Sequence, residues 1–283
     1  MTETLSLIDT HCHLVLLDER GMLEESLGAA AAAGVEQIVS VGLNVEDSDA
    51  NRELAERHPG VFFTVGWHPH ERAAPDAAQL RALDELLRHP RAVAVGEIGL
   101  DWFWRPGYHE VAPEVQRRSL RLMLELAATH AKPIVVHDRD AHDDVLAELR
   151  DAFGPGDHEN RGVMHCFSGD AALARAAGEL GMVCSFAGTV TFPRAEGIRD
   201  AARTLPEGGY AVETDAPFLA PVPHRGRPNQ PAYVAVTAAA VAELRGEPTA
   251  AVAASATATA RRLFGLPGGE GRDHLGGRQR PAG

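Results

Sequence analysis

Six histidine and carboxylate side chains stand at or just after the ends of short apolar runs in the sequence. They are His11 and His13 in IDTHCH, Glu97 in VAVGEIGLD, His137 in PIVVHDRDA, His165 in GVMHCFSG and Asp215 in YAVETDAPFL. Imidazole nitrogens and carboxylate oxygens bind divalent ions in hydrolases, and four imidazoles with two carboxylates exceed the needs of one tetrahedral ion. If the apolar runs bring these groups together, they predict a site for two divalent metal ions.

The spacing of the first two histidines suits a shared ion. Alternate residues of a strand point to the same side, so His11 and His13 can reach one ion while Cys12 between them faces away. Glu97 is the natural bridge between two ions, because its carboxylate offers two oxygens. A single histidine at a strand end is usually structural, but chance is a poor explanation for six such residues at one face. The thiols of Cys12 and Cys166 are expected to be small buried groups rather than nucleophiles.

A second set of polar residues is expected to hold the substrate. It comprises His68 in TVGWHPH, Arg139 shortly after the fifth apolar run, and His224, Arg225 and Arg227 in the proline-rich stretch PVPHRGRPNQP. Guanidinium groups bind phosphate oxygens well, and loops at one end of barrel enzymes commonly bind phosphate. The alternative for the proline-rich stretch is a rigid surface turn with solvated charges. Its position directly after Asp215 favours phosphate binding.

Short β-branched runs alternate with helical patterns along nearly the whole chain. Strands are predicted over residues 5–9, 37–41, 61–65, 92–95, 133–136, 162–164, 182–186 and 210–212, and helices over 23–33, 77–88, 114–130, 141–153 and 171–180. This alternation predicts the α/β class and a single (β/α)8 barrel of the TIM type, regular or distorted, whose carboxyl strand ends surround one cavity. A doubly wound open sheet is the alternative, but no GxGxxG motif follows the first strand.

Two further helices, over 233–245 and 248–264, are expected to close the barrel, so that residues 1–266 form one hydrolase domain. Residues 267–283 hold almost nothing apolar and are predicted to be a disordered tail. The other histidines in helical or loop segments are expected at the surface: His58, His89, His109, His130, His142, His158 and His274.

The composition excludes several classes of protein. With 283 residues, of which 45% are hydrophobic and 24% charged, the chain can bury a full core and is not disordered throughout. A net charge of −13 argues against a protein that coats nucleic acid with a broad basic face, but not against an enzyme that binds one or two phosphates.

The start MTETLSLIDTH lacks a secretory signal, and the three cysteines do not form a disulfide framework. We expect a cytoplasmic protein with no membrane association and no obligate protein partner.

Several stretches resemble, in order and spacing, the TatD-like family of metal-dependent deoxyribonucleases, a branch of the amidohydrolase-like barrels. They are DTHCHL, VGWHPH, GEIGLD, VVHDRDA, HCFSG, ETDAPFLAPVPHRGRPNQP and ARRLFGL. The resemblance implies a first ion held by His11, His13, Glu97 and Asp215, and a second held by Glu97, His137 and His165. It also implies that Asp215 accepts a proton beside the hydrolytic water, and that His68, Arg139, His224 and Arg225 lie near the substrate.

The chain departs from the family at Val15, where an aspartate is common, and at Thr259, where an asparagine is usual. Neither position is a proposed ligand, so the departures bear on loop shape and substrate preference only.

The predicted function is hydrolysis of DNA phosphodiester bonds from an end of the strand. Two divalent ions would lower the pKa of a shared water and neutralise the phosphate oxygens, with Glu97 and Asp215 as the catalytic carboxylates. The metal is left open between Mg²⁺, Mn²⁺ and Zn²⁺. One alternative is hydrolysis of a small-molecule ester, amide or phosphate ester at the same site. The other is a non-catalytic protein with a structural metal, against which the complete set of ligands argues.

Overall fold

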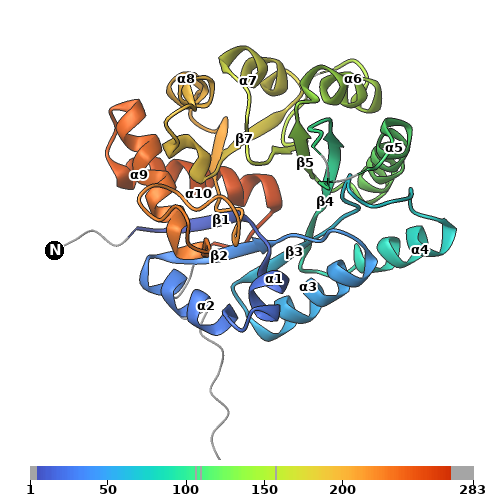
Figure 1. Cartoon of the computed structure of the whole chain (residues 1–283), viewed down its shortest axis with the longest axis horizontal. Coiled ribbons are helices and arrows are strands. Elements are labelled where there is room, and N and C mark those ends of the chain that lie inside the picture. The colour runs from blue at the N-terminus through green and yellow to red at the C-terminus, as the bar shows by residue number, and fades with distance from the viewer. Residues whose placement is uncertain (1–4, 106, 109, 157, 269–283) are drawn as a thin grey trace, which may run out of the picture.

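The computed structural model describes residues 5–105, 107–108, 110–156 and 158–268. Its strands are β1 (Leu7–Cys12), β2 (Val35–Ser40), β3 (Val61–Val65), β4 (Ala92–Asp101), β5 (Ile134–Arg139), β6 (Gly162–Met164), β7 (Met182–Phe186) and β8 (Tyr210–Val212). Each strand pairs in parallel with the next, in the order β1 to β8, and helices surround the strands (Figure 1). The predicted (β/α)8 barrel is confirmed.

In the described part of the chain, the first eight α-helices lie between consecutive strands and the last two follow β8. They are α1 (Leu14–Glu19), α2 (Leu23–Ala32), α3 (Val45–Arg57), α4 (Ala77–Leu86), α5 (Pro113–His130), α6 (His142–Phe153), α7 (Ala171–Gly178), α8 (Glu196–Thr204), α9 (Val234–Arg245) and α10 (Thr249–Phe264), with short 3₁₀ helices η1 (Gly188–Thr191) and η2 (Pro231–Tyr233). Helix α5 buries Leu120, Leu124 and Ala127, the stripe expected from its sequence. Helices α1, α3 and α8 were not among the predicted ones.

The barrel closes between β1 and the segment that follows β8. The amide of Asp215 donates to the carbonyl of His11 at 2.9 Å, and the amide of His13 donates to the carbonyl of Ala216 at 2.8 Å. The Thr10 hydroxyl adds a bond to the carbonyl of Val212 at 3.0 Å. Closure therefore holds the His-Cys-His segment and Asp215, which lie far apart in the sequence, side by side.

One end of the barrel is filled by α10. A single apolar cluster gathers one or two residues from every strand, namely Ile8, Val39, Phe62, Val93, Ala94, Val135, Val163, Val183 and Ala211, together with Ala260, Leu263, Phe264 and Leu266 from the last helix and the residues after it. Other strand residues pack instead against the outer helices. Helix α10 therefore covers this end of the barrel, and the carboxyl ends of the strands are left to form the functional face.

Strand β4 is six residues longer at its carboxyl end than the predicted strand 92–95, so Glu97 lies within the strand and not after it. Two glycines in this extension, Gly96 and Gly99, allow close strand packing. A Cβ atom on Gly96 would lie 2.5 Å from Val135 Cβ, and one on Gly99 would lie 1.9 Å from the carbonyl oxygen of His137. Strand β1 likewise runs to Cys12 rather than ending at position 9.

His58 is buried, contrary to the prediction that it lies at the surface. It follows the last residue of α3, and its Nε2 faces Glu24 Oε1 of α2 at 3.6 Å. His109, His274 and the tail from residue 269 lie outside the described residues. Within the described part of the chain, no helix has the length and apolar character needed to cross a membrane.

Candidate metal centre

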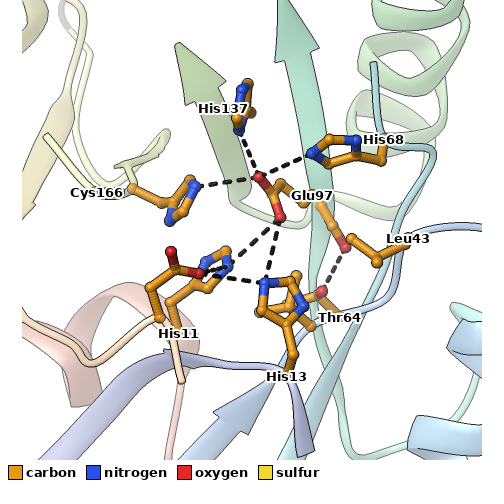
Figure 2. Close-up of polar contacts among 12 residues, drawn as sticks. His11, His13, Leu43, Thr64, His68, Glu97, His137 and Cys166 are labelled. Carbon is orange, nitrogen blue, oxygen red and sulfur yellow. Dashed lines mark hydrogen bonds and ion pairs between the residues drawn. The ribbon is translucent and has the colours of Figure 1, made fainter. Parts of the chain in front are cut away.

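Glu97 of β4 lies at the centre of a histidine cluster (Figure 2). Its Oε1 atom lies 2.7 Å from Nδ1 of His137 in β5, and 3.1 Å from Nε2 of His165 after β6. The same oxygen lies 3.4 Å from Nε2 of His68, which follows β3. Three histidines from different strand ends therefore face one oxygen of a single buried carboxylate.

The other oxygen of Glu97 faces the His-Cys-His segment. Oε2 lies 3.5 Å from His11 Nε2 and 4.0 Å from His13 Nε2. Asp215 Oδ1 completes this side, 3.2 Å from His13 Nε2 and 3.7 Å from His11 Nε2. The structure thus brings the six expected ligands together and divides the histidines between the two oxygens of one carboxylate. A carboxylate that bridges two ions has this kind of surroundings.

Burial and mutual charge set the ionisation of these groups. Burial opposes the charged form of Glu97, but His165 and His68 outweigh it and hold the pKa of this carboxyl well below its usual range. Burial also opposes the charged form of His165, but Glu97 and Glu213 raise its pKa well above the usual value. For His68, burial prevails and lowers the pKa to about 4. Glu97 is thus ionised at neutral pH, the state in which a carboxylate binds metal.

Some buried nitrogens of the cluster have no hydrogen-bond partner among the described residues: both ring nitrogens of His11 and Nδ1 of His13. Buried polar atoms in folded proteins are nearly always paired. Overlapping groups place their donor atoms within 4.8 Å of one another, namely His11 with Glu97 and His165, His11 with His13 and Asp215, His68 with Glu97 and His137, and His70 with Asp101 and His137. Imidazole nitrogens beside carboxylate oxygens suit divalent transition ions, so the donor set fits a metal centre.

Two carboxylates that the sequence analysis missed lie beside the ring nitrogens of His137 and His165 that do not face Glu97. Asp101 Oδ2 lies 3.1 Å from His137 Nε2, and Glu213 Oε1 lies 3.1 Å from His165 Nδ1. Such partners fix the tautomer and orientation of a histidine ligand. A signal was present: Asp101 lies four residues beyond Glu97 in one strand, and alternate strand residues share a face. It was overlooked because the fourth strand was predicted to end at position 95.

Asp101 also joins the cluster to a neighbouring polar network. Its Oδ2 atom lies 2.8 Å from Nε2 of His70, a second residue that the analysis missed, and 3.3 Å from the hydroxyl of Tyr108. That hydroxyl accepts a bond from the guanidinium of Arg139 at 2.6 Å. Arg139, one of the expected substrate-binding residues, is therefore connected to His137 through two side chains.

We expect Asp101→Asn to weaken metal binding about 10- to 100-fold, because the amide keeps the size of Asp101 but loses the charge that orients His137. Titration of metal-stripped protein with Zn²⁺ or Mn²⁺ against a chelating dye measures this. Asp144→Asn is the matched control, since Asp144 accepts bonds from Trp102 and Arg117 and from no proposed ligand among the described residues. Equal affinity in Asp101→Asn and wild type would contradict the role.

The backbone beside Asp215 is held by two buried polar side chains. Asp9 accepts the Thr214 amide at 2.9 Å and the Thr214 hydroxyl at 2.5 Å, and burial raises the pKa of Asp9 to about 8. Asn229, from the proline-rich loop, donates to the carbonyl of Thr214 at 2.7 Å. These bonds support Asp215 in a left-handed conformation with φ of 58°.

The expected substrate-binding residues fall into two groups. His68 faces Glu97 directly, and Arg139 reaches the cluster through Tyr108. The three residues of the proline-rich loop are held elsewhere: His224 stacks on Tyr233 with ring centroids 3.9 Å apart, the Arg225 guanidinium lies 4.0 Å from the Phe192 ring centroid, and Arg227 is exposed. No contact among the described residues joins this second group to Glu97.

The thiols nearby are protonated at neutral pH. Cys12 is buried, with its Sγ 3.8 Å from the carbonyl of Ala216, as expected for a residue that faces away from its histidine neighbours. Cys166 is only partly buried as a whole residue, which corrects the expectation of full burial. Burial raises the pKa of both thiols well above the usual value.

Comparisons with known proteins identify relatives of this chain. The model of the TatD related DNase family matches residues 8–265. A metal-dependent hydrolase named TatD from Mycobacterium tuberculosis is 38% identical over 264 residues, covering 92% of this chain and 98% of the relative. A 3'-5' ssDNA/RNA exonuclease TatD from Klebsiella pneumoniae is 34% identical over 250 residues, covering 86% and 92%. The crystal structure of YjjV, a TatD homologue from Escherichia coli, superposes with a TM-score of 0.85 at 33% identity, covering 94% of this chain and all of that one.

The fold and the cluster of donors define a metal-dependent hydrolase barrel. The chain belongs to the TatD family, since the family model spans nearly all of the described residues and relatives above 30% identity cover the chain almost end to end.

Proposed function

We propose that the protein hydrolyses phosphodiester bonds of DNA from an end of the strand, with two divalent ions at the cluster around Glu97. The proposal depends on one observation about that carboxylate. Its Oε1 faces His137 and His165, whereas its Oε2 faces His11 and His13. In this assignment, one ion is held by His11, His13, Glu97 and Asp215, and the other by Glu97, His137 and His165. When bound, the ions supply a water of lowered pKa and positive charge for the phosphate oxygens.

Asp215 is the proton acceptor in this proposal. Burial opposes its ionised form, but the facing His13 outweighs it and lowers the pKa of Asp215, so the group is ionised at neutral pH, the state that a proton acceptor requires. Because neighbouring bonds fix its backbone, the carboxylate needs little reorganisation to receive the proton from the attacking water and return it to the leaving oxygen. His68 and Arg139 orient the phosphate, and His224, Arg225 and Arg227 bind the strand farther from the cluster.

The family label and the printed name of the Klebsiella pneumoniae relative support a nucleic-acid substrate and attack from an end. A second candidate is a two-metal hydrolase of a small-molecule ester, amide or phosphate ester. The net charge of −13 favours this second candidate, because the 40 acidic residues outnumber the 27 basic ones and binding along a long polyanion needs an extended basic surface.

Digestion of end-labelled oligonucleotides separates the two candidates. Metal-stripped protein is given single-stranded DNA, duplex DNA or RNA, with Mg²⁺, Mn²⁺ or Zn²⁺ added back, beside panels of ester, amide and phosphate-ester substrates. The proposal predicts stepwise shortening of DNA that requires an added ion. Protein that binds two ions, leaves every oligonucleotide intact and cleaves a small ester or amide would be assigned to the second candidate.

A further inference from the structure

An exposed aromatic ring lies at the rim of the metal centre. Phe218 is 45% exposed, and few large apolar residues in the described part of the chain are exposed to this extent. Its ring meets the imidazole of His13 edge to face, with centroids 5.6 Å apart and planes at 75°. The ring therefore borders a proposed metal ligand and still offers apolar surface to solvent.

The loop presents this ring on a fixed backbone. The amide of Phe218 donates to the carbonyl of Asp215 at 2.8 Å, and its own carbonyl accepts from the buried amide of Asn229 at 2.6 Å. The next residue, Leu219, has a φ of +53°, and a Cβ atom on Gly188 would lie 2.3 Å from its carbonyl oxygen. Close packing against a glycine and paired backbone groups thus hold Phe218 in place before any ligand binds.

A fixed, exposed aromatic ring beside a phosphate-cleaving centre matches the chemistry of single-strand binding. Aromatic side chains bind nucleobases by stacking, and any base can serve because every base has a π-face. Exposed apolar surface rimmed by polar groups also marks binding sites in general. An acidic protein gains particularly from such a contact, since stacking needs no positive charge. We propose that Phe218 stacks on a nucleobase adjacent to the scissile phosphate, an inference that rests on the proposed function.

Other exposed apolar side chains carry this role less well. Trp104 is 71% exposed, but among the described residues it has no ring contact with a proposed ligand. Val222 is 44% exposed on the same loop as Phe218 and has no aromatic face. Val222 is therefore the matched control for a change of exposed apolar surface on this loop.

The test compares intact oligonucleotides with ones that carry a single abasic tetrahydrofuran unit at each of the last three positions from either end. The readout is the ratio of kcat/KM for the intact and the abasic strand. We expect a ratio of about 10 at one position in wild type, retained in Phe218→Tyr and Val222→Ala, and a ratio near 1 in Phe218→Leu. A wild-type ratio near 1 at every position, or an undiminished ratio in Phe218→Leu, would overturn the assignment while leaving the nuclease function standing.

A second readout separates failure of stacking from failure of cleavage. 2-Aminopurine placed at the same positions loses fluorescence when it stacks, whether or not the strand is cut. Quenching by wild type and not by Phe218→Leu, with no cleavage under any metal, would support the stacking contact and defeat the proposed hydrolysis. Absence of quenching in wild type at every position would defeat the stacking contact.

Discussion

Replacing Asp215 by asparagine is expected to lower kcat about 100- to 10,000-fold, the range in which a positioned general base contributes. The amide keeps an oxygen that can bind a metal, but it cannot accept a proton. Affinity for oligonucleotide should therefore change far less than turnover. Single-turnover rates and KM on end-labelled single-stranded DNA measure the two quantities separately.

Two further variants make the Asp215→Asn result specific. Asp18→Asn removes an exposed carboxylate that faces Arg57 at 3.5 Å, away from the cluster, and should retain wild-type turnover. Metal content must be measured in Asp215→Asn as well, because lost ions would also abolish turnover. Normal turnover in Asp215→Asn, together with a large loss in Arg225→Ala, would show that the proton acceptor has been placed wrongly.

The barrel was predictable from the sequence because its strands are short, apolar and separated by helical patterns. The ends of the strands were less predictable. A glycine in a sequence fits either a turn or close strand packing, and in the structure the missing side chains of Gly96 and Gly99 let β5 lie close to β4. Tertiary packing decides between these two uses of glycine, and a single sequence does not contain that information.

The same limit explains which parts of the site were missed. The six expected ligands could be found because each stands near a strand end, and the barrel brings such ends together. Asp101 and His70 lie on the extension of β4 and on the loop after β3, so their meeting depends on the true length of β4. The arginines of the proline-rich loop show the opposite case. They follow Asp215 closely in the sequence, but an irregular loop has no regular repeat, so the sequence does not predict the direction of their side chains.

Glu97→Gln is expected to have the largest effect on metal content. One carboxylate faces all the histidines of the cluster: His11, His13, His68, His137 and His165. If Glu97 bridges two ions, its loss weakens both sites at once, whereas the loss of any single histidine weakens one. Elemental analysis after dialysis should find two ions per chain in wild type and fewer than one in Glu97→Gln. Turnover should fall with the metal content.

The control for that substitution is Glu148→Gln, which alters another buried carboxylate, paired with Arg117 and Arg121 on the outside of the barrel. It should keep both ions. A measurement in metal-free protein gives independent support. Burial opposes the charged form of His137, but Asp101 and then Glu97 raise its pKa to about 9, so Glu97→Gln should lower that pKa in an NMR titration of the imidazole.

The pattern of loss distinguishes a bridge from an ordinary ligand. A Glu97→Gln protein that keeps one tightly bound ion, with the lowered His137 pKa, would place Glu97 on a single metal and leave the second site to other donors. Two groups with the required spacing do not include Glu97: His11 with His13 and Asp215, and His70 with Asp101 and His137. Combining Glu97→Gln with Asp101→Asn decides between them: loss of the remaining ion would place it beside Asp101, and its retention would place it at His11, His13 and Asp215.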